Sequence, residues 1–258
     1  MSNALIIADT HLPFVHREYL GFCKDTQRRY GCTNVCHVGD VVDNHAISFH
    51  DPDPNGMSPA EELRLVRKEL KRWFRAFPKV KAAIGNHDEL HRRKAYRDGI
   101  PDGFLKSFKD AFEAPAGWQF GFEWRFGNWR LIHGTGTSGH DAAFKSAISG
   151  RISTAQGHIH TAAGVKFHAS NKDIIWGMQV ACGIDRKAYA FNYGRDFKDK
   201  PVLGCGVVLE NGRIPMFVPM PSRRPFDRIT APEPRCGLQP AGILRTMRAS
   251  ARSMTALW

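Results

Sequence analysis

Five short apolar runs of this sequence end in residues that can bind a metal ion. The runs are "ALIIADTH", "NVCHVGDVVDN", "VKAAIGNHD", "WRLIHG" and "STAQGHIH". Short apolar runs bounded by polar residues are typical of buried strands. In a layered α/β protein the loops at strand ends converge on one edge of a sheet, so ligands far apart in sequence can meet there. The five segments therefore predict one metal site.

The donor set of this predicted site indicates which ions it binds. It comprises the carboxylate, amide and imidazole groups at the ends of these runs, which are Asp9, His11, Asp40, Asp43, Asn86, His87, Asp88, His133, His158 and His160. A mixed oxygen and nitrogen set without thiolates suits Mn²⁺, Fe, Zn²⁺, Ni²⁺ or Co²⁺. Among these ions we expect Mn²⁺.

The order of the five blocks resembles that of the calcineurin-like metallophosphoesterases across roughly residues 5 to 165. That superfamily has Asp-x-His, Gly-Asp-x-x-Asp, Gly-Asn-His-Asp/Glu, a lone His and Gly-His-x-His. The matching blocks here are 9–11, 39–43, 85–88, His133 and 157–160. A closer resemblance, reaching about residue 218, is to the short phosphoesterases of phages and bacteria. It is carried by "GDVVDNHAISFHDPDP", "GNHDEL", "QGHIHTAAG" and "GMQVACGIDRKAYAF".

The resemblance implies a role for each residue of the blocks. The implied cofactor is a pair of divalent metal ions about 3.5 to 4 Å apart that share a carboxylate, polarise a phosphoester and generate hydroxide at neutral pH. The implied ligands are Asp9, His11 and His160 for one ion, Asn86, His133 and His158 for the other, and Asp40 as the bridge. His87 would act on the substrate, stabilising the transition state or donating a proton to the leaving oxygen, and Asp88 would keep its ring oriented. Asp43 is expected to make a structural hydrogen bond. The implied reaction is in-line attack of a metal-bridging hydroxide on phosphorus.

The residues around the blocks bear on the substrate. Phosphoprotein phosphatases of this superfamily carry an arginine after Gly-Asp-x-x-Asp and another before Gly-Asn-His, where this chain has Asn44 and Ile84. The loss of two phosphate-clamping guanidinium groups favours a phosphodiester over a monoester. The alternative for each candidate substrate contact is a polar loop residue or part of a solvated helix face. The candidates are His45, His50, Arg92, Arg93, Lys94 and Arg97.

Three functions are consistent with the sequence. The first is a phosphodiesterase acting on a nucleotide-like or small substrate. The second is a nuclease acting on DNA or RNA, which the formal net charge of +12 favours because a basic surface attracts polyanions. The third is a non-catalytic, metal-stabilised interaction module, which the intact His87 and metal ligands disfavour. The sequence does not fix the oligomeric state.

The elements that must position these residues follow from periodicity. A helix over 58–77 is predicted to open on a capping box and to carry an apolar face. Further helices are expected over 15–30, over 140–149, and around Phe104, Phe108 and Phe112, and hairpins at Gly127-Asn128 and Asn211-Gly212. We expect an α/β (α+β) fold, a four-layer αββα sandwich of two mixed β-sheets flanked by helices.

The chain divides by composition. Its 258 residues predict a metallophosphoesterase domain over 1–220 and a basic Pro/Arg-rich C-terminal tail over 221–258, docked or disordered. No apolar run approaches the roughly 20 residues of a membrane helix, and no secretory signal is visible. We therefore expect a cytoplasmic protein, in the host cytoplasm if phage-encoded, with its six cysteines reduced.

Overall fold

Two mixed β-sheets form the centre of the structure, a computed structural model that describes residues 2–49, 53–188, 190–191 and 198–221. The first sheet has six strands in the order β11 (Ile214–Pro219), β10 (Gly204–Leu209), β1 (Ala4–Ile7), β2 (Asn34–His37), β3 (Val80–Ala83) and β4 (Trp118–Gly121). The second has five, in the order β5 (Glu123–Phe126), β6 (Trp129–Ile132), β7 (Ser153–Gln156), β9 (Ile174–Gln179) and β8 (Gly164–Ala169).

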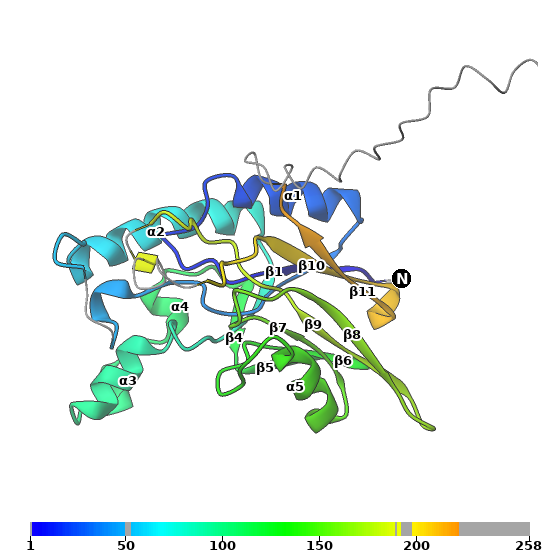
Figure 1. Ribbon diagram of the computed structural model, residues 1–258. Coiled ribbons are helices and arrows are strands. Elements are labelled where there is room, and N and C mark those ends of the chain that lie inside the picture. The colour runs from blue at the N-terminus through cyan, green and yellow to red at the C-terminus, as the bar shows by residue number, and fades with distance from the viewer. Residues whose placement is uncertain (1, 50–52, 189, 192–197, 222–258) are drawn as a thin grey trace, which may run out of the picture. The chain divides into compact units, whose positions relative to one another are not determined.

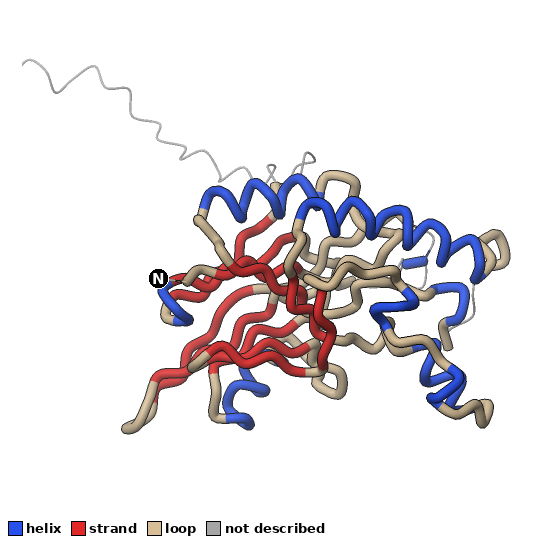
Figure 2. Tube along the Cα trace, turned by 180° about the vertical axis from the view of Figure 1, so that it is seen from behind, coloured by secondary structure: helices blue, strands red, loops and turns tan. Residues whose placement is uncertain are grey.

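Helices cover the outer faces of both sheets (Figure 1). Helices α1 (Tyr19–Arg29) and α2 (Pro59–Ala76) lie along the first sheet, and α5 (Ala142–Gly150) lies on the second. The view from behind shows the same order of helix, sheet, sheet and helix (Figure 2). The predicted αββα sandwich is confirmed. Three-residue 3₁₀ helices cover 45–47, 102–104 and 210–212, and two further α-helices are α3 (Leu90–Arg97) and α4 (Phe108–Ala111).

Parallel strands carry the predicted site residues to one edge of each sheet. Strands β1, β2 and β3 are parallel neighbours in the first sheet, and β6 and β7 are parallel neighbours in the second. All four residues of β1 are buried, because this strand is covered by helices on one face and by the other sheet on the opposite face. Burial on both faces explains why the strand is a continuous apolar run without alternation.

Helix α2 begins as its sequence predicts. The Ser58 Oγ accepts a hydrogen bond from the Glu61 backbone N–H at 3.4 Å, and the Glu61 Oε2 accepts one from the Ser58 N–H at 3.0 Å. Together with Pro59 in the first turn, these bonds form the predicted capping box. The apolar face buries Val66 and Trp73 against the first sheet.

The helix expected around Phe104, Phe108 and Phe112 is not continuous. The chain forms a 3₁₀ turn over 102–104 and then α4, which Ser107 caps by accepting a hydrogen bond from the Asp110 N–H at 3.2 Å. Phe104 is 81% exposed and lies outside the core. The prediction was wrong because local capping by Ser107 starts a new helix there, against the apolar period.

Both predicted hairpins are present. Phe126 pairs with Trp129 across Gly127, whose φ of 64° lies in the left-handed region. Leu209 pairs with Ile214 across Asn211 and Gly212, which have φ of 57° and 102°. Glycine and asparagine tolerate such angles better than other residues do.

The predicted tail over 221–258 lies outside the described residues, apart from Pro221. No helix among the described residues is both long enough and apolar enough to cross a membrane.

Candidate metal centre

The predicted metal ligands meet at the C-terminal ends of β1, β2, β3, β6 and β7. In three sets of three residues, one ligand atom from each side chain lies within 4.8 Å of the others. The first set is Asp9, His11 and His160, the second is Asp40, His133 and His158, and the third, His11, Asp40 and His87, shares a residue with each of them. Asn86 joins the second set, because its Oδ1 lies 3.0 Å from the His133 Nε2. The structure therefore brings all seven side chains together, as expected from the strand ends.

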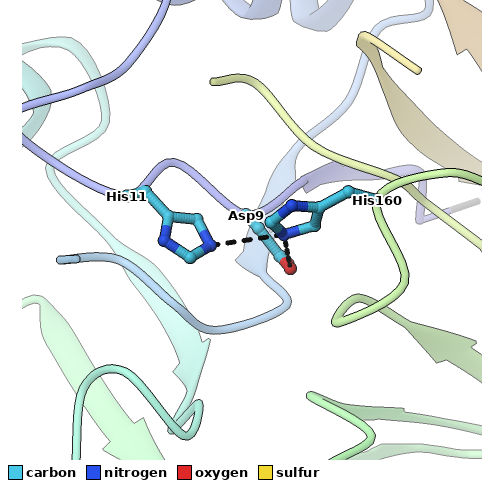
Figure 3. A group of neighbouring side chains, drawn as sticks. All are labelled: Asp9, His11 and His160. Atoms are coloured by element: carbon cyan, nitrogen blue, oxygen red, sulfur yellow. Dashed lines mark hydrogen bonds and ion pairs between the residues drawn. The ribbon is translucent and has the colours of Figure 1, made fainter. Parts of the chain in front are cut away.

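The first set surrounds Asp9 (Figure 3). The His160 Nε2 lies 3.0 Å from the Asp9 Oδ2 and 3.3 Å from the His11 Nε2. Two imidazole nitrogens that face each other at this distance compete for one proton, whereas both can donate a lone pair to a cation. Burial would raise the pKa of Asp9, but its hydrogen bond with His160 and the nearby imidazoles outweigh burial and lower it.

An unsatisfied oxygen in this set fits a metal ion. Asp9 is completely buried, and its Oδ1 has no hydrogen-bond partner among the described residues. A buried carboxylate oxygen without a partner is unfavourable, and native structures normally pair it with a donor or an ion. The carboxylate and imidazole donors of this set are therefore the correct chemistry for a divalent cation.

The second set surrounds His133. Its Nδ1–H donates to the Val38 carbonyl oxygen at 3.0 Å, which turns its Nε2 toward the Asp40 Oδ2 at 3.2 Å. Burial lowers the pKa of His133, but the carboxylates of Asp40, Asp9 and Asp88 together outweigh burial and raise it to about 9. The same negative field that favours an imidazolium here favours a divalent cation.

Asp40 lies between the two sets. Its Oδ2 is 3.5 Å from the His11 Nε2 and 3.2 Å from the His133 Nε2, while its Oδ1 accepts the His87 backbone N–H at 2.8 Å. Burial would raise the pKa of Asp40, but the surrounding imidazoles hold it well below its usual value. A single ionised carboxylate is thus shared by two groups of donors.

Asp43 holds two histidines of the cluster. The His11 Nδ1–H donates to the Asp43 Oδ1 at 2.5 Å, and the His87 Nδ1–H donates to the Asp43 carbonyl oxygen at 2.8 Å. Both contacts fix the ring tautomer and leave each Nε2 available to the cluster. As expected, Asp43 makes hydrogen bonds. Burial lowers the pKa of His87, but Asp40 and Asp43 outweigh burial and raise it.

Asp88 does not orient the His87 ring, and this expectation was wrong. Its Oδ2 accepts the Gly85 N–H at 2.9 Å, and its Oδ1 accepts the Val42 N–H at 3.1 Å. These bonds fasten the loop after β3 to the loop after β2. Burial raises the pKa of Asp88 to about 7. The side chain is directed to backbone amides because it is buried between the loops, while His87 points toward the Asp43 carbonyl.

The glycines of the motifs are required by close packing against the carboxylates. A Cβ at position 85 would lie 2.1 Å from the Asp40 Oδ1, and one at position 157 would lie 2.2 Å from the Asp9 Oδ1. Both distances are far below van der Waals contact. Gly85 and Gly157 therefore allow the backbone to approach the carboxylates, a requirement that turn geometry alone does not predict.

Three candidate ligands have strained backbones. His11, Asp40 and His158 have φ of 45°, 47° and 69°, in the left-handed region that residues with a Cβ seldom adopt. Such strain persists where the surrounding structure imposes it, and it is concentrated at functional sites. The hydrogen bonds described above supply that constraint, which is consistent with a site built for ligand geometry at some cost in stability.

A buried network that the sequence reading missed links two of the site loops. The Gly39 N–H donates to the His37 Nδ1 at 3.1 Å, so the His37 Nε2–H donates to the Thr10 Oγ1 at 3.1 Å, and the Thr10 hydroxyl donates to the Val41 carbonyl at 2.9 Å. Burial lowers the pKa of His37 to about 4, which keeps the ring neutral. The available signal was a histidine at the end of an otherwise apolar strand.

The candidate substrate contacts have different environments. His45 lies beside the site, with its Nδ1 3.9 Å from the Asp43 Oδ2. Arg92 pairs with Asp102 at 3.3 Å and packs over Phe108, so the structure does not bring it to the metal ligands. Arg93 is exposed, and its guanidinium lies over Phe49. His50 lies outside the described residues.

Neither a protein-family model nor a curated protein sequence matches the chain. Similar solved structures include a metallophosphoesterase from Sphaerobacter thermophilus, at 14% identity, 86% coverage of this chain, 89% of that chain and a TM-score of 0.43. Vacuolar protein sorting 29 from Cryptosporidium parvum is 10% identical, and the match covers 80% of this chain and 83% of that chain with a TM-score of 0.42. Yfce, a phosphoesterase from E. coli, is 13% identical, and the match covers 80% of this chain and 87% of that chain with a TM-score of 0.39.

With TM-scores below 0.5, these likenesses carry no weight for substrate or mechanism. The ordered motifs, the αββα layers and the assembled histidine and aspartate side chains are observations on this chain itself. By these features the chain resembles the calcineurin-like metallophosphoesterases.

Proposed function

We propose that this chain hydrolyses phosphodiesters with the help of two divalent cations. The observation that carries the proposal is the position of the Asp40 Oδ2, 3.5 Å from the His11 Nε2 and 3.2 Å from the His133 Nε2. A shared carboxylate flanked by two sets of donors is the arrangement that a pair of neighbouring cations requires.

The proposed ligands are Asp9, His11 and His160 for one cation, Asn86, His133 and His158 for the other, and Asp40 for both. When bound, such cations neutralise charge on phosphate oxygens and lower the pKa of water from 15.7 toward about 7. The chain contributes fixed donors in a buried setting, where electrostatic interactions are stronger than in water. Mn²⁺ is the cation we propose for activity, and Fe, Zn²⁺, Ni²⁺ and Co²⁺ fit the same donors.

We assign His87 the role of proton donor to the leaving oxygen. Its Nδ1–H is engaged by the Asp43 carbonyl at 2.8 Å, which leaves the Nε2 to exchange a proton with a substrate. The carboxylates of Asp40 and Asp43 raise its pKa despite burial, so they favour the protonated ring. Its ring centroid lies 4.6 Å from that of His11, close to the proposed ligands.

The side chain at position 44 supports a diester over a monoester. Asn44 occupies the place where phosphoprotein phosphatases carry an arginine, and its Nδ2–H donates to the His87 carbonyl at 2.9 Å. It thus holds the loop of His87 and is not a cationic phosphate clamp. A monoester carries more negative charge than a diester and gains more from such a clamp.

The test is hydrolysis of an aryl phosphodiester and an aryl phosphomonoester by metal-stripped protein, with each of the five cations added in turn. The proposal predicts metal-dependent turnover with a higher kcat/KM for the diester. Asp40→Asn and His87→Ala should abolish it, and Asp173→Asn, at an exposed ion pair with Arg151, is the matched control. Inactivity of the wild type on both esters with every cation would contradict the proposal, and a monoester preference would contradict its diester part.

A further inference from the structure

Three cations of α3 surround one exposed aromatic ring. The Arg93 Cζ, Lys94 Nζ and Arg97 Cζ lie 5.1, 5.4 and 5.4 Å from the centroid of the Phe49 ring. Phe49 is 45% exposed. We call Phe49, Arg93, Lys94 and Arg97 the α3 cluster. Each cation is within the distance at which an aromatic face attracts positive charge.

The α3 cluster has an excess of positive charge. Arg97 pairs with Asp98 at 3.2 Å, whereas Arg93 and Lys94 have no ion pair among the residues that the structure describes. Like charges gathered around one ring repel one another, and a bound anion relieves that repulsion. The neighbouring Arg92, by contrast, is neutralised by Asp102. The cluster is therefore electrostatically suited to a polyanion.

The residues of the α3 cluster directly follow two loops of the candidate metal centre in the sequence. Helix α3 begins at Leu90, three residues after His87. Phe49 lies two residues after the 3₁₀ helix over 45–47. Asn44, which precedes that helix, is tied to the site, because its side chain donates to the His87 carbonyl at 2.9 Å. A ligand bound at the cluster therefore lies along the same two loops that carry the proposed proton donor.

Both sides of the α3 cluster are held by packed elements. The His45 and Ala46 N–H groups donate to the two carboxylate oxygens of Glu62 at 2.8 Å each, which fixes the turn before Phe49 on α2. Leu90 and Ala95 are the buried residues of α3, at 3% and 6% exposure, and they anchor the helix. Figure 1 shows α3 apart from both sheets. A preformed surface loses less conformational entropy on binding than a flexible one does.

Two further aromatic rings, one on α3 and one in the 3₁₀ helix that follows it, are also open to solvent. Tyr96 is 87% exposed and Phe104 is 81% exposed. Exposed rings interleaved with cations are characteristic of surfaces that bind single-stranded nucleic acid, because each base has a face that can stack on them. The bases of a duplex are already stacked on one another, so this chemistry selects single strands.

We propose that the α3 cluster binds single-stranded nucleic acid, with Phe49 stacking on a base and the three cations contacting the backbone phosphates. This inference rests on the proposed phosphodiesterase function and adds its substrate class. The strand would approach the metal centre along the loops of Asn44 and His87, so the phosphodiester bonds of its backbone are the bonds to be cleaved. Single-stranded DNA and RNA share the chemistry that the cluster recognises, and the test below includes both.

The test measures fluorescence anisotropy of labelled 20-residue single-stranded DNA, single-stranded RNA and duplex DNA with the full chain in EDTA, which prevents cleavage. The inference predicts tighter binding of the single strands than of the duplex. Phe49→Ala should weaken single-strand binding roughly 5- to 150-fold, the equivalent of one lost stacked base. Phe49→Trp should retain it. Circular dichroism checks that each variant is folded.

The salt dependence separates the cations from the ring. The double variant Arg93→Gln with Arg97→Gln should reduce the slope of log K against log salt by about 1.4, because each phosphate contact to a single strand contributes about 0.7. The matched control is Arg64→Gln with Lys68→Gln, which removes two exposed cations of α2. The control should leave single-strand affinity within about twofold, after allowance for the general loss of charge.

Failure of this inference is distinguishable from failure of the proposed function. Equal affinity for single strands and duplex, or an equal loss in the control and in the double variant, would overturn the inference. Hydrolysis of the aryl diester by the wild type, measured separately, would leave the proposed function standing in that case. Selective binding of single strands with no hydrolysis of any diester would support the cluster and overturn the function.

Discussion

His11 and Asp43 are joined by a 2.5 Å hydrogen bond from the imidazole Nδ1–H to the carboxylate Oδ1. Both side chains are almost completely buried. The bond turns the His11 Nε2 toward Asp40, 3.5 Å away, and makes the ring a stronger donor to a cation. Asp43 therefore contacts the candidate metal centre through His11, one of the proposed ligands.

The first prediction concerns Asp43. Asp43→Asn keeps a hydrogen-bond acceptor but removes the charge that strengthens His11, so Mn²⁺ affinity should fall about 10- to 100-fold. Isothermal titration of the metal-stripped protein measures it. Asp173→Asn, which changes the same group at an exposed site, should bind Mn²⁺ like the wild type. An unchanged affinity in Asp43→Asn would show that His11 needs no support from this carboxylate.

The second prediction concerns Gly85. In Gly85→Ala the new Cβ would lie 2.1 Å from the Asp40 Oδ1 and 2.4 Å from the Asp40 backbone nitrogen, so Asp40 must move. Overpacking of this kind costs about 1 to 3 kcal/mol of stability, and Mn²⁺ binding should be lost. Gly21→Ala, which meets nothing within 4 Å on α1, should leave binding intact and stabilise the fold slightly. Thermal melts and titration give both quantities.

The convergence of the ligands could be predicted because it depends on a pattern that is local in the sequence. Each apolar run ends where a strand ends, and parallel strands bring such ends together. The start of α2 was equally predictable, since Ser58, Pro59 and Glu61 form their bonds within one turn. Hydrogen bonds between residues this close in the sequence can be predicted before the fold is known.

The errors arose where tertiary distance decides between similar residues. Asp43 and Asp88 are both acids at the end of a motif, and only the fold shows that Asp43 contacts the histidines while Asp88 binds backbone amides. The role of His37 was not predicted, because it lies in a mostly apolar strand. In the structure its ring links two loops through Gly39 and Thr10. Phe104 fits a helical stripe by spacing alone, but capping at Ser107 breaks that helix.

The third prediction concerns pH and His37. Its pKa is about 4 in the folded protein against an ordinary value of 6.5, because burial disfavours the charged ring. The unfolded chain therefore binds a proton more readily. The stability that the neutral ring contributes is complete above pH 6.5 and is lost as the pH falls from 6.5 toward 4.

The loss from this one group amounts to about 3 kcal/mol. Urea unfolding of the metal-stripped wild type and of His37→Gln, at intervals from neutral pH to pH 4, measures the difference between the two pH dependences. The glutamine variant should be less stable at neutral pH, because the link between Gly39 and Thr10 is weakened. It should also lose less stability on acidification. Parallel curves for the two proteins would contradict a neutral His37.

The fourth prediction concerns metal addition to the stripped protein. Without a cation the fold buries the Asp9 Oδ1, which has no hydrogen-bond partner in the part of the chain that the structure describes. It also holds the Nε2 atoms of His11 and His160 at 3.3 Å from each other. An ion that binds only the folded chain stabilises it by about 2.7 kcal/mol at a hundred times its Kd. Mn²⁺ should therefore raise the Tm in proportion to the logarithm of its concentration.

Asp9→Asn weakens the negative field, so its Tm should respond far less, while Asp173→Asn should respond like the wild type. If Asp9→Asn and the wild type gave equal shifts, the ion would be binding elsewhere on the chain, and the unpaired oxygen would need another explanation.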